Sequence, residues 1–151
     1  MAPVTDTYIS NHFGEIWPAH VAEFSQYLIE CRKYFRGDLD LLLLLAVIGD
    51  RTLVAGKVDP SITYPDLLSG NHLKFRPDPI NYHSIAEFTG IPRESVRRKI
   101  QYLIDIGWVA RTDEGSLFAT KMSTRELEPL TRATFKYLAR MAAILSPAKS
   151  R

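Results

Sequence analysis

Residues 84–108, SIAEFTGIPRESVRRKIQYLIDIGW, decide the fold. They predict a short helix, a tight turn at Thr89-Gly90-Ile91 and a longer helix that stops at Gly107. Gly90 suits the turn because glycine adopts the left-handed backbone at no steric cost. In the longer helix, an apolar stripe lies apart from cationic and amide side chains. The apolar residues are Val96, Ile100, Leu103 and Ile104, and the polar ones are Arg93, Arg97, Arg98 and Gln101. One side of this helix is therefore expected in a small core and the other in solvent.

Short elements flank the helix pair. Asn81 is a candidate N-cap for the first helix, and a very short strand is expected near Ile80. Downstream, residues 108–111 and 116–119 predict two strands joined by residues 112–115, whose sequence Thr-Asp-Glu-Gly is ordinary hairpin-turn chemistry. The order strand, helix, turn, helix and hairpin is that of a winged helix-turn-helix.

This segment resembles the winged helix-turn-helix transcription regulators of bacteria. The sequence IPRESVRRKIQYLIDIGWV is similar to the recognition-helix stretch of the GntR-like regulators, whose pattern is close to SRxTVRxALxxLxxxGxV. The arrangement of helices before and after the winged domain resembles the MarR-like regulators, which dimerise through those helices. The motif resemblance covers about residues 80–120. It implies a homodimeric, sequence-specific DNA-binding transcription regulator that acts in the cytoplasm.

The resemblance also implies roles for individual residues. Arg93 and Arg97 match positions that contact DNA, and Ser95 matches a hydroxyl that often touches a phosphate. The position of Arg93 agrees, because the N-terminal end of a recognition helix enters the major groove. Neighbours on the helix and one cation in the hairpin would fix the register on the DNA backbone. The complete set of expected DNA contacts is Arg93, Ser95, Arg97, Arg98, Gln101 and Arg111.

Charge is concentrated in the same region. The whole chain has a net charge of only +2, which alone is a weak argument for nucleic acid. Between positions 93 and 111, however, five basic residues outnumber two acidic ones. The basic residues are Arg93, Arg97, Arg98, Lys99 and Arg111.

Two features depart from the GntR-like pattern. The hairpin tip carries Asp113 and Glu114, where such wings usually have a glycine-rich tip, and carboxylates repel a phosphate wall. Pro92 replaces the serine that commonly caps the recognition helix. The acidic tip and the low net charge keep an alternative open, a winged-helix protein–protein interaction module with no DNA target.

The N-terminal part predicts a dimer interface. Residues 1 to about 10 are expected to form a loose arm, followed by a helix from about Asn11 to Phe35. Aromatic residues recur along this helix in four- and three-residue steps, and the stripe is wider than one packing partner requires. We therefore expect a second copy of the chain to cover it, and two-fold symmetry also suits palindromic operators. The expected interface residues are Phe13, Trp17, Phe24, Tyr27 and Tyr34.

The apolar run 39–48 is far shorter than the ~20 residues that span a bilayer. It predicts a helix from Leu39 to about Leu53, with Asp38 as N-cap, buried on nearly all sides. Residues 57–79 hold four of the nine prolines and predict an irregular connection with one helical turn at 64–68. Its length and the aromatic residues Tyr64 and Phe75 raise the hypothesis of a small-molecule effector between this segment and the N-terminal helices.

The last helix is predicted to run to about Leu145, with a capping box of Ser123 and Glu126 at its start and a break at Pro129. The expected fold is thus mostly α with a small β-hairpin wing, a winged helix-turn-helix flanked by N- and C-terminal helices. The expected division is 1–56 for the N-terminal helices, 57–79 for the connection, 80–120 for the DNA-binding domain and 121–151 for the C-terminal helix and tail.

Other function classes find no support in the residues. The single cysteine, Cys31, fits a reducing compartment, and the N-terminus lacks the pattern of a secretory signal. No Ser/His/Asp arrangement, phosphate loop or carboxylate pair indicates an enzyme, and no cofactor is expected. No metal site is expected either, because the spacing of the candidate ligands suits none. Those candidates are His12, His20, His72, His83 and Cys31.

Overall fold

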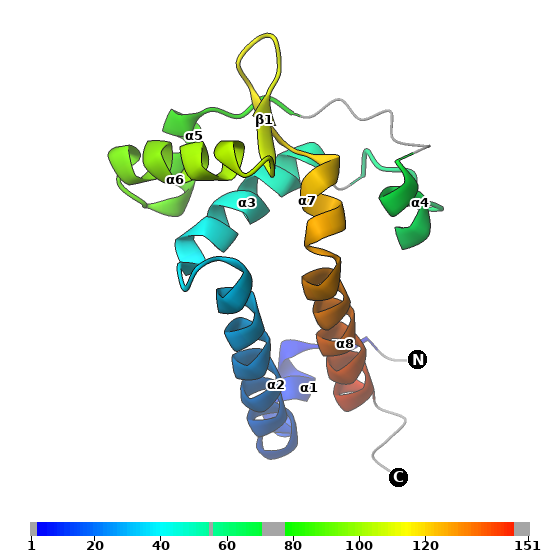
Figure 1. Cartoon of the computed structure of the whole chain (residues 1–151). Helices are drawn as coiled ribbons and strands as arrows, with labels where there is room; N and C mark the ends of the chain where they lie inside the picture. The colour runs from blue at the N-terminus through cyan, green and yellow to red at the C-terminus, as the bar shows by residue number, and fades with distance from the viewer. Residues whose placement is uncertain (1–2, 55, 71–77, 147–151) are drawn as a thin grey trace. The chain divides into compact units, whose positions relative to one another are not determined.

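The computed structural model describes residues 3–54, 56–70 and 78–146. In these ranges it contains eight helices and one two-stranded antiparallel sheet (Figure 1). The predicted fold class, mostly helical with a small hairpin, is confirmed. The chain divides into two compact units. The first unit consists of Met1–Arg36 together with Pro129–Arg151, and the second unit is Gly37–Glu128.

The first unit contains the helices α1 (Asp6–Asn11), α2 (Phe13–Tyr34) and nearly all of α8 (Glu128–Leu145). Polar side-chain contacts join α2 to α8, among them Tyr27 to Thr134 at 2.7 Å, His20 to Tyr137 at 3.1 Å, and Glu23 to Arg140 at 2.9 Å. The prediction of a loose arm over residues 1–10 is wrong from Asp6 onward. Thr5 caps α1, because its side chain accepts a hydrogen bond from the amide of Tyr8.

The second unit contains five helices and the hairpin in its described residues. They are α3 (Leu39–Thr52), α4 (Tyr64–Ser69), α5 (Tyr82–Thr89), α6 (Arg93–Asp105), β1 (Val109–Arg111), β2 (Leu117–Ala119) and α7 (Lys121–Glu126). Ala110 pairs with Phe118 in the middle of the antiparallel hairpin. The predicted helical turn at 64–68 and both predicted strands are therefore present, each strand one residue shorter than expected.

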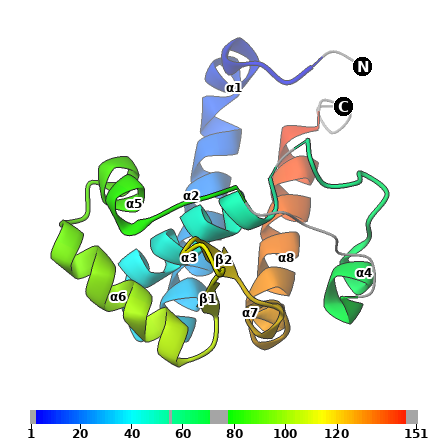
Figure 2. The ribbon, with the colours of Figure 1, turned by 90° about the horizontal axis from the view of Figure 1, so that it is seen from above.

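Helix α3 is the support on which the helix pair and the hairpin pack. It contacts α5, α6 and β2, and Figure 2 shows it next to the hairpin. Leu44 and Ile48 are fully buried on its inner side, whereas Leu39 and Leu43 are 37% and 41% exposed. The expectation of a helix buried on nearly all sides is therefore wrong. The expected division placed α3 with residues 1–56, whereas its contacts place it in the unit of the hairpin.

Residues close in sequence determine where the helices α5 and α6 begin and end. The Asn81 side chain accepts a hydrogen bond from the amide of Ser84 and caps α5, as predicted. Gly90 ends α5 with a φ of 73°, the left-handed conformation that glycine favours. No strand forms at Ile80. Its carbonyl instead accepts a single hydrogen bond from the amide of Leu117, at 3.2 Å, beside the hairpin.

The region between the hairpin and the last helix differs from the predicted capping box. Thr120, not Ser123, is the N-cap of α7, and its side chain accepts from the amide of Ser123. Glu126 is instead bound by the indole of Trp108, which donates to its carboxylate at 2.5 Å. The break expected at Pro129 is present, since α7 ends at Glu126 and α8 begins at Glu128.

Candidate nucleic-acid interface

Helix α6 has one buried and one exposed face. Val96, Ile100 and Leu103 are 0% exposed and anchor the helix in the core of the second unit. The turns of the helix leave a cationic and amide side in solvent, as a recognition helix requires. Exposed on that side are Arg93, Arg97, Arg98 and Gln101.

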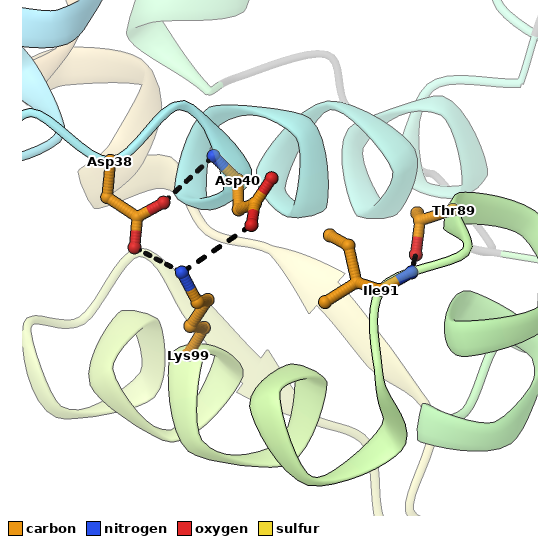
Figure 3. A network of polar contacts seen from close by, with 5 residues as sticks. All are labelled: Asp38, Asp40, Thr89, Ile91 and Lys99. Carbon is orange, nitrogen blue, oxygen red and sulfur yellow. Dashed lines mark hydrogen bonds and ion pairs between the residues drawn. The ribbon is translucent and has the colours of Figure 1, made fainter.

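Lys99 does not belong to the exposed cationic surface. Its side chain is only 18% exposed and its ammonium forms an ion pair with Asp38, with Asp40 at 3.6 Å (Figure 3). The hydrogen bond from Lys99 holds the pKa of Asp38 below its usual value, against the opposing effect of burial. The cationic excess counted from the sequence therefore overstates what α6 offers a partner, because one of its charges is neutralised internally.

An open groove of about 570 Å³ runs along the exposed side of α6. Four of the six predicted contact residues line it: Arg97, Arg98, Gln101 and Arg111. Arg93 and Ser95 are not among its lining residues. Arg93 is exposed at the first position of α6, and Ser95 is half-buried. The structure thus brings the hairpin cation beside the central part of α6.

The groove also holds residues that sequence reasoning did not select. Tyr82, at the start of α5, and Tyr102 line it together with Glu94 and Asp105. The Arg111 guanidinium lies over the Tyr82 ring, 5.7 Å from its centroid, and donates to the Tyr82 hydroxyl. The only sequence signal for Tyr82 was its place directly after the Asn81 cap, which does not reveal the neighbouring hairpin.

The guanidinium of Arg97 and the side-chain amide of Gln101 bind carboxylates that a ligand can replace. Arg97 donates to the Glu94 carboxylate at 2.6 Å, which lowers the pKa of Glu94 and raises that of Arg97. Gln101 donates to Asp105 at 2.9 Å. Both pairs lie on the solvent-exposed side of the helix, where such contacts contribute little to stability. A ligand with anionic groups could therefore displace the carboxylates.

The hairpin tip is exposed and acidic. The amide of Thr112 donates to the Ser116 carbonyl at 2.7 Å, and Gly115 closes the turn with a φ of 85°. Asp113 and Glu114 are both exposed there. Arg111 is thus the cation through which the hairpin joins the groove.

The aromatic stripe of α2 divides into an exposed and a covered part. Phe13, Trp17 and Phe24 are 55%, 48% and 39% exposed. Tyr27 stacks on Tyr137 of α8 with 5.5 Å between ring centroids, and Tyr34 is half-buried. Phe24 also contacts Tyr137, with 5.9 Å between ring centroids, so α8 covers it in part, and Phe13 and Trp17 are the more exposed rings of the predicted interface.

Among the described residues, no cluster of three or more histidine, cysteine or acidic side chains could hold a metal ion. Cys31 is fully buried, and burial raises the pKa of its thiol. No helix in the part of the chain that the structure describes is both long and apolar enough to cross a membrane. His72 and Phe75, named above for a metal and an effector, lie outside the described residues.

The chain matches no protein-family model, no curated protein and no solved structure.

Proposed function

We propose that this protein is a sequence-specific DNA-binding transcription regulator that acts as a homodimer in the cytoplasm. Its winged helix-turn-helix would place α6 in the major groove. The observation that carries this proposal is that α6 has one apolar face in the core and one cationic and amide face in solvent. Three fully buried residues fix the helix, while Arg97, Arg98 and Gln101 share one groove with Arg111 of the hairpin. Arginine is the commonest reader of guanine edges in the major groove, and arginine and glutamine also donate to backbone phosphates.

The contacts would divide into two kinds. Arg93 and Arg97, on the N-terminal half of α6, would reach base edges or phosphates, because this end of the helix enters the groove. Ser95, Arg98, Gln101 and Arg111 would fix the register on the backbone. The carboxylates of Glu94 and Asp105 would give up their present partners when DNA arrives.

A second copy of the chain would bind through the exposed rings of α2. Phe13, Trp17 and Phe24 present a row of apolar surface, and aromatic residues are enriched at protein interfaces. A two-fold dimer would place two copies of α6 in successive major grooves, about 34 Å apart.

One observation favours a protein-interaction module instead. Arg97 is paired with Glu94, Gln101 with Asp105, and the hairpin tip is acidic. A surface of alternating charges suits a protein partner of complementary pattern. The two functions differ in salt dependence, because DNA binding releases counterions and weakens steeply as salt rises.

The deciding experiment is a selection of bound duplexes from a random pool, with the parent and with the double variant Arg97→Ala/Arg98→Ala. Arg125→Ala is the matched control, because Arg125 is an exposed cation on α7 outside the groove. We expect the parent and the control to enrich one palindromic sequence and the double variant to enrich none. If the parent enriches nothing and its retention on DNA does not change with salt, the interaction module replaces the DNA proposal.

A further inference from the structure

The second unit contains another concave site, which shares no lining residue with the α6 groove. This pocket of about 340 Å³ is lined by the C-terminal end of α3, by α4, by the hairpin and by α7. Most of its wall is apolar, with Leu53, which follows α3, Leu67 from α4 and Phe118 from β2. Its volume is at the lower end of the range for small-molecule sites, which suits a ligand of about ten to fifteen non-hydrogen atoms.

Two hydroxyl groups of the pocket wall, those of Thr52 and Thr120, form hydrogen bonds within the protein. Thr52 donates to the Ile48 carbonyl at 2.9 Å and accepts from the amide of Ala119 at 3.0 Å. Thr120 donates to the Gly107 carbonyl at 2.6 Å while it caps α7. These bonds tie the hairpin to α3 and to the start of α7, so this part of the pocket is built by the fold itself.

The other polar side chains of the pocket, Thr112, Lys121 and Thr124, can still donate hydrogen bonds to a ligand. The Thr112 hydroxyl accepts from the amide of Ser116 and keeps its own proton for a ligand. Within the described residues, the Thr124 hydroxyl makes no side-chain hydrogen bond, and Lys121 has no carboxylate partner. The Lys121 ammonium donates a long hydrogen bond to the Gly70 carbonyl, at 3.5 Å, which leaves it donor capacity for an anion. One ammonium and two hydroxyl groups beside an apolar wall are complementary to a carboxylate with an apolar body.

We propose that this pocket binds a small organic monocarboxylate, with the carboxylate at Lys121 and the apolar body against Leu53, Leu67 and Phe118. The ammonium and the threonine hydroxyls donate to the anion, and the apolar walls remove the rest of the ligand from water. The proposal does not depend on DNA binding, because every residue it uses lies outside the α6 groove.

The test is calorimetric titration of the full chain with octanoate and with 4-phenylbutanoate, two carboxylates of different shape. Octylammonium, which has the same apolar chain and the opposite charge, is the matched ligand control. We expect at least one carboxylate to bind and octylammonium not to bind. Amide NMR shifts in the parent should concentrate at Leu53, Leu67 and Thr124.

Two variants test the location. A side chain at Gly49, which lines the pocket inside α3, meets open space, so Gly49→Leu fills the pocket and replaces glycine with a better helix former. Gly14→Leu is its matched control, because Gly14 lies in α2 and a Cβ there also meets open space. Gly49→Leu should abolish binding and Gly14→Leu should leave it unchanged. Lys121→Gln should weaken binding about three- to fivefold, the range of an exposed ion pair.

The proposal is overturned if neither carboxylate binds at concentrations up to about 10 mM, the weak limit for a ligand of this size. It is also overturned if octylammonium binds as well as the carboxylates, or if Gly49→Leu binds like the parent. Should Gly49→Leu fail to fold, Lys121→Gln and the NMR map in the parent decide the question.

Discussion

Lys99 of α6 forms an ion pair with Asp38, the residue that caps α3 (Figure 3). One carboxylate oxygen of Asp38 accepts from the amide of Asp40 at 3.0 Å, and the other faces the Lys99 ammonium. A single side chain therefore starts the supporting helix and also ties it to the candidate recognition helix. Because Lys99 is only 18% exposed, solvent screens this pair less than a fully exposed one.

Replacing Asp38 with alanine should destabilise the second unit. The variant loses the N-cap of α3 and leaves the mostly buried Lys99 without its nearest carboxylate, for a cost of about 1–3 kcal/mol in unfolding free energy. Asp38→Asn should cost less, because asparagine still caps a helix. Urea unfolding followed by circular dichroism measures both. Asp50→Ala, at an exposed position of the same helix, should change little. Equal losses for alanine and asparagine would show that the ion pair, not the cap, carries the effect.

The same pair predicts a pH dependence. The pKa of Asp38 is lowered in the folded protein, first of all by the hydrogen bond from Lys99. Its carboxylate therefore contributes stability that is present above the unfolded pKa, about 3.9, and is lost as the pH falls through the lower folded pKa. The difference in unfolding free energy between the parent and Asp38→Asn should be constant from about pH 7 to pH 5 and shrink towards pH 3. A difference that stays constant down to pH 3 would contradict the assigned shift.

Sequence reasoning located the helix pair because its signals are local. Asn81, Gly90 and the apolar stripe of α6 each act within one or two turns of helix, and each is where the sequence placed it. The six-residue helix α1 was not predicted, because its sequence has no apolar periodicity. It forms because Thr5 caps it and Asp6 places a favourable negative charge in its first turn. In place of the strand expected at Ile80, the structure has one hydrogen bond to the hairpin, and among the described residues no second backbone bond extends it into a ladder.

The site was predictable only in part, for the same reason. The periodicity of α6 places Arg97, Arg98 and Gln101 on one side, and the structure agrees. The inward turn of Lys99 depends on where α3 packs, and no pattern within residues 84–108 encodes that position. Tyr82 meets Arg111 across 29 residues of sequence, which is likewise a tertiary contact.

Removing cations from the groove should weaken DNA binding in proportion to their number. Arg97→Ala and Arg98→Ala should each lower affinity, by roughly 10- to 100-fold where the arginine reads a base and less where it meets a phosphate. If both contact phosphates, the double variant should also reduce the slope of log affinity against log salt by about two per protomer. Fluorescence anisotropy across a salt series measures both quantities. Arg125→Ala should reproduce the parent, and an equal loss in that control would mean that the effect is one of net charge alone.

Glu94 should act as an internal competitor of DNA. It accepts from Arg97 at 2.6 Å, so the glutamine variant leaves Arg97 without an anionic partner and removes a charge that repels phosphate. Glu94→Gln should therefore tighten DNA binding by about two- to fivefold at low salt, with a smaller gain at high salt. Glu114→Gln at the hairpin tip is the matched control for the lost charge. Weaker DNA binding by Glu94→Gln would contradict this and would show that the Glu94 carboxylate contacts the DNA directly, as a carboxylate does when it accepts from a cytosine amino group.

The exposed rings of α2 should determine self-association. Trp17 and Phe24 are 48% and 39% exposed in the single chain, and two such rings supply a large share of the apolar area at the centre of an interface. Trp17→Ala/Phe24→Ala should weaken the dimer at least about tenfold, measured by sedimentation equilibrium. Phe88→Ala is the matched control, since Phe88 is 64% exposed but lies in α5 of the second unit. Because each half of a palindrome needs one copy of α6, the double variant should also lose the preference for palindromic over single half-sites. A parent that sediments as a monomer at all concentrations tested would refute the dimer while leaving the α6 groove as a monomeric binding surface.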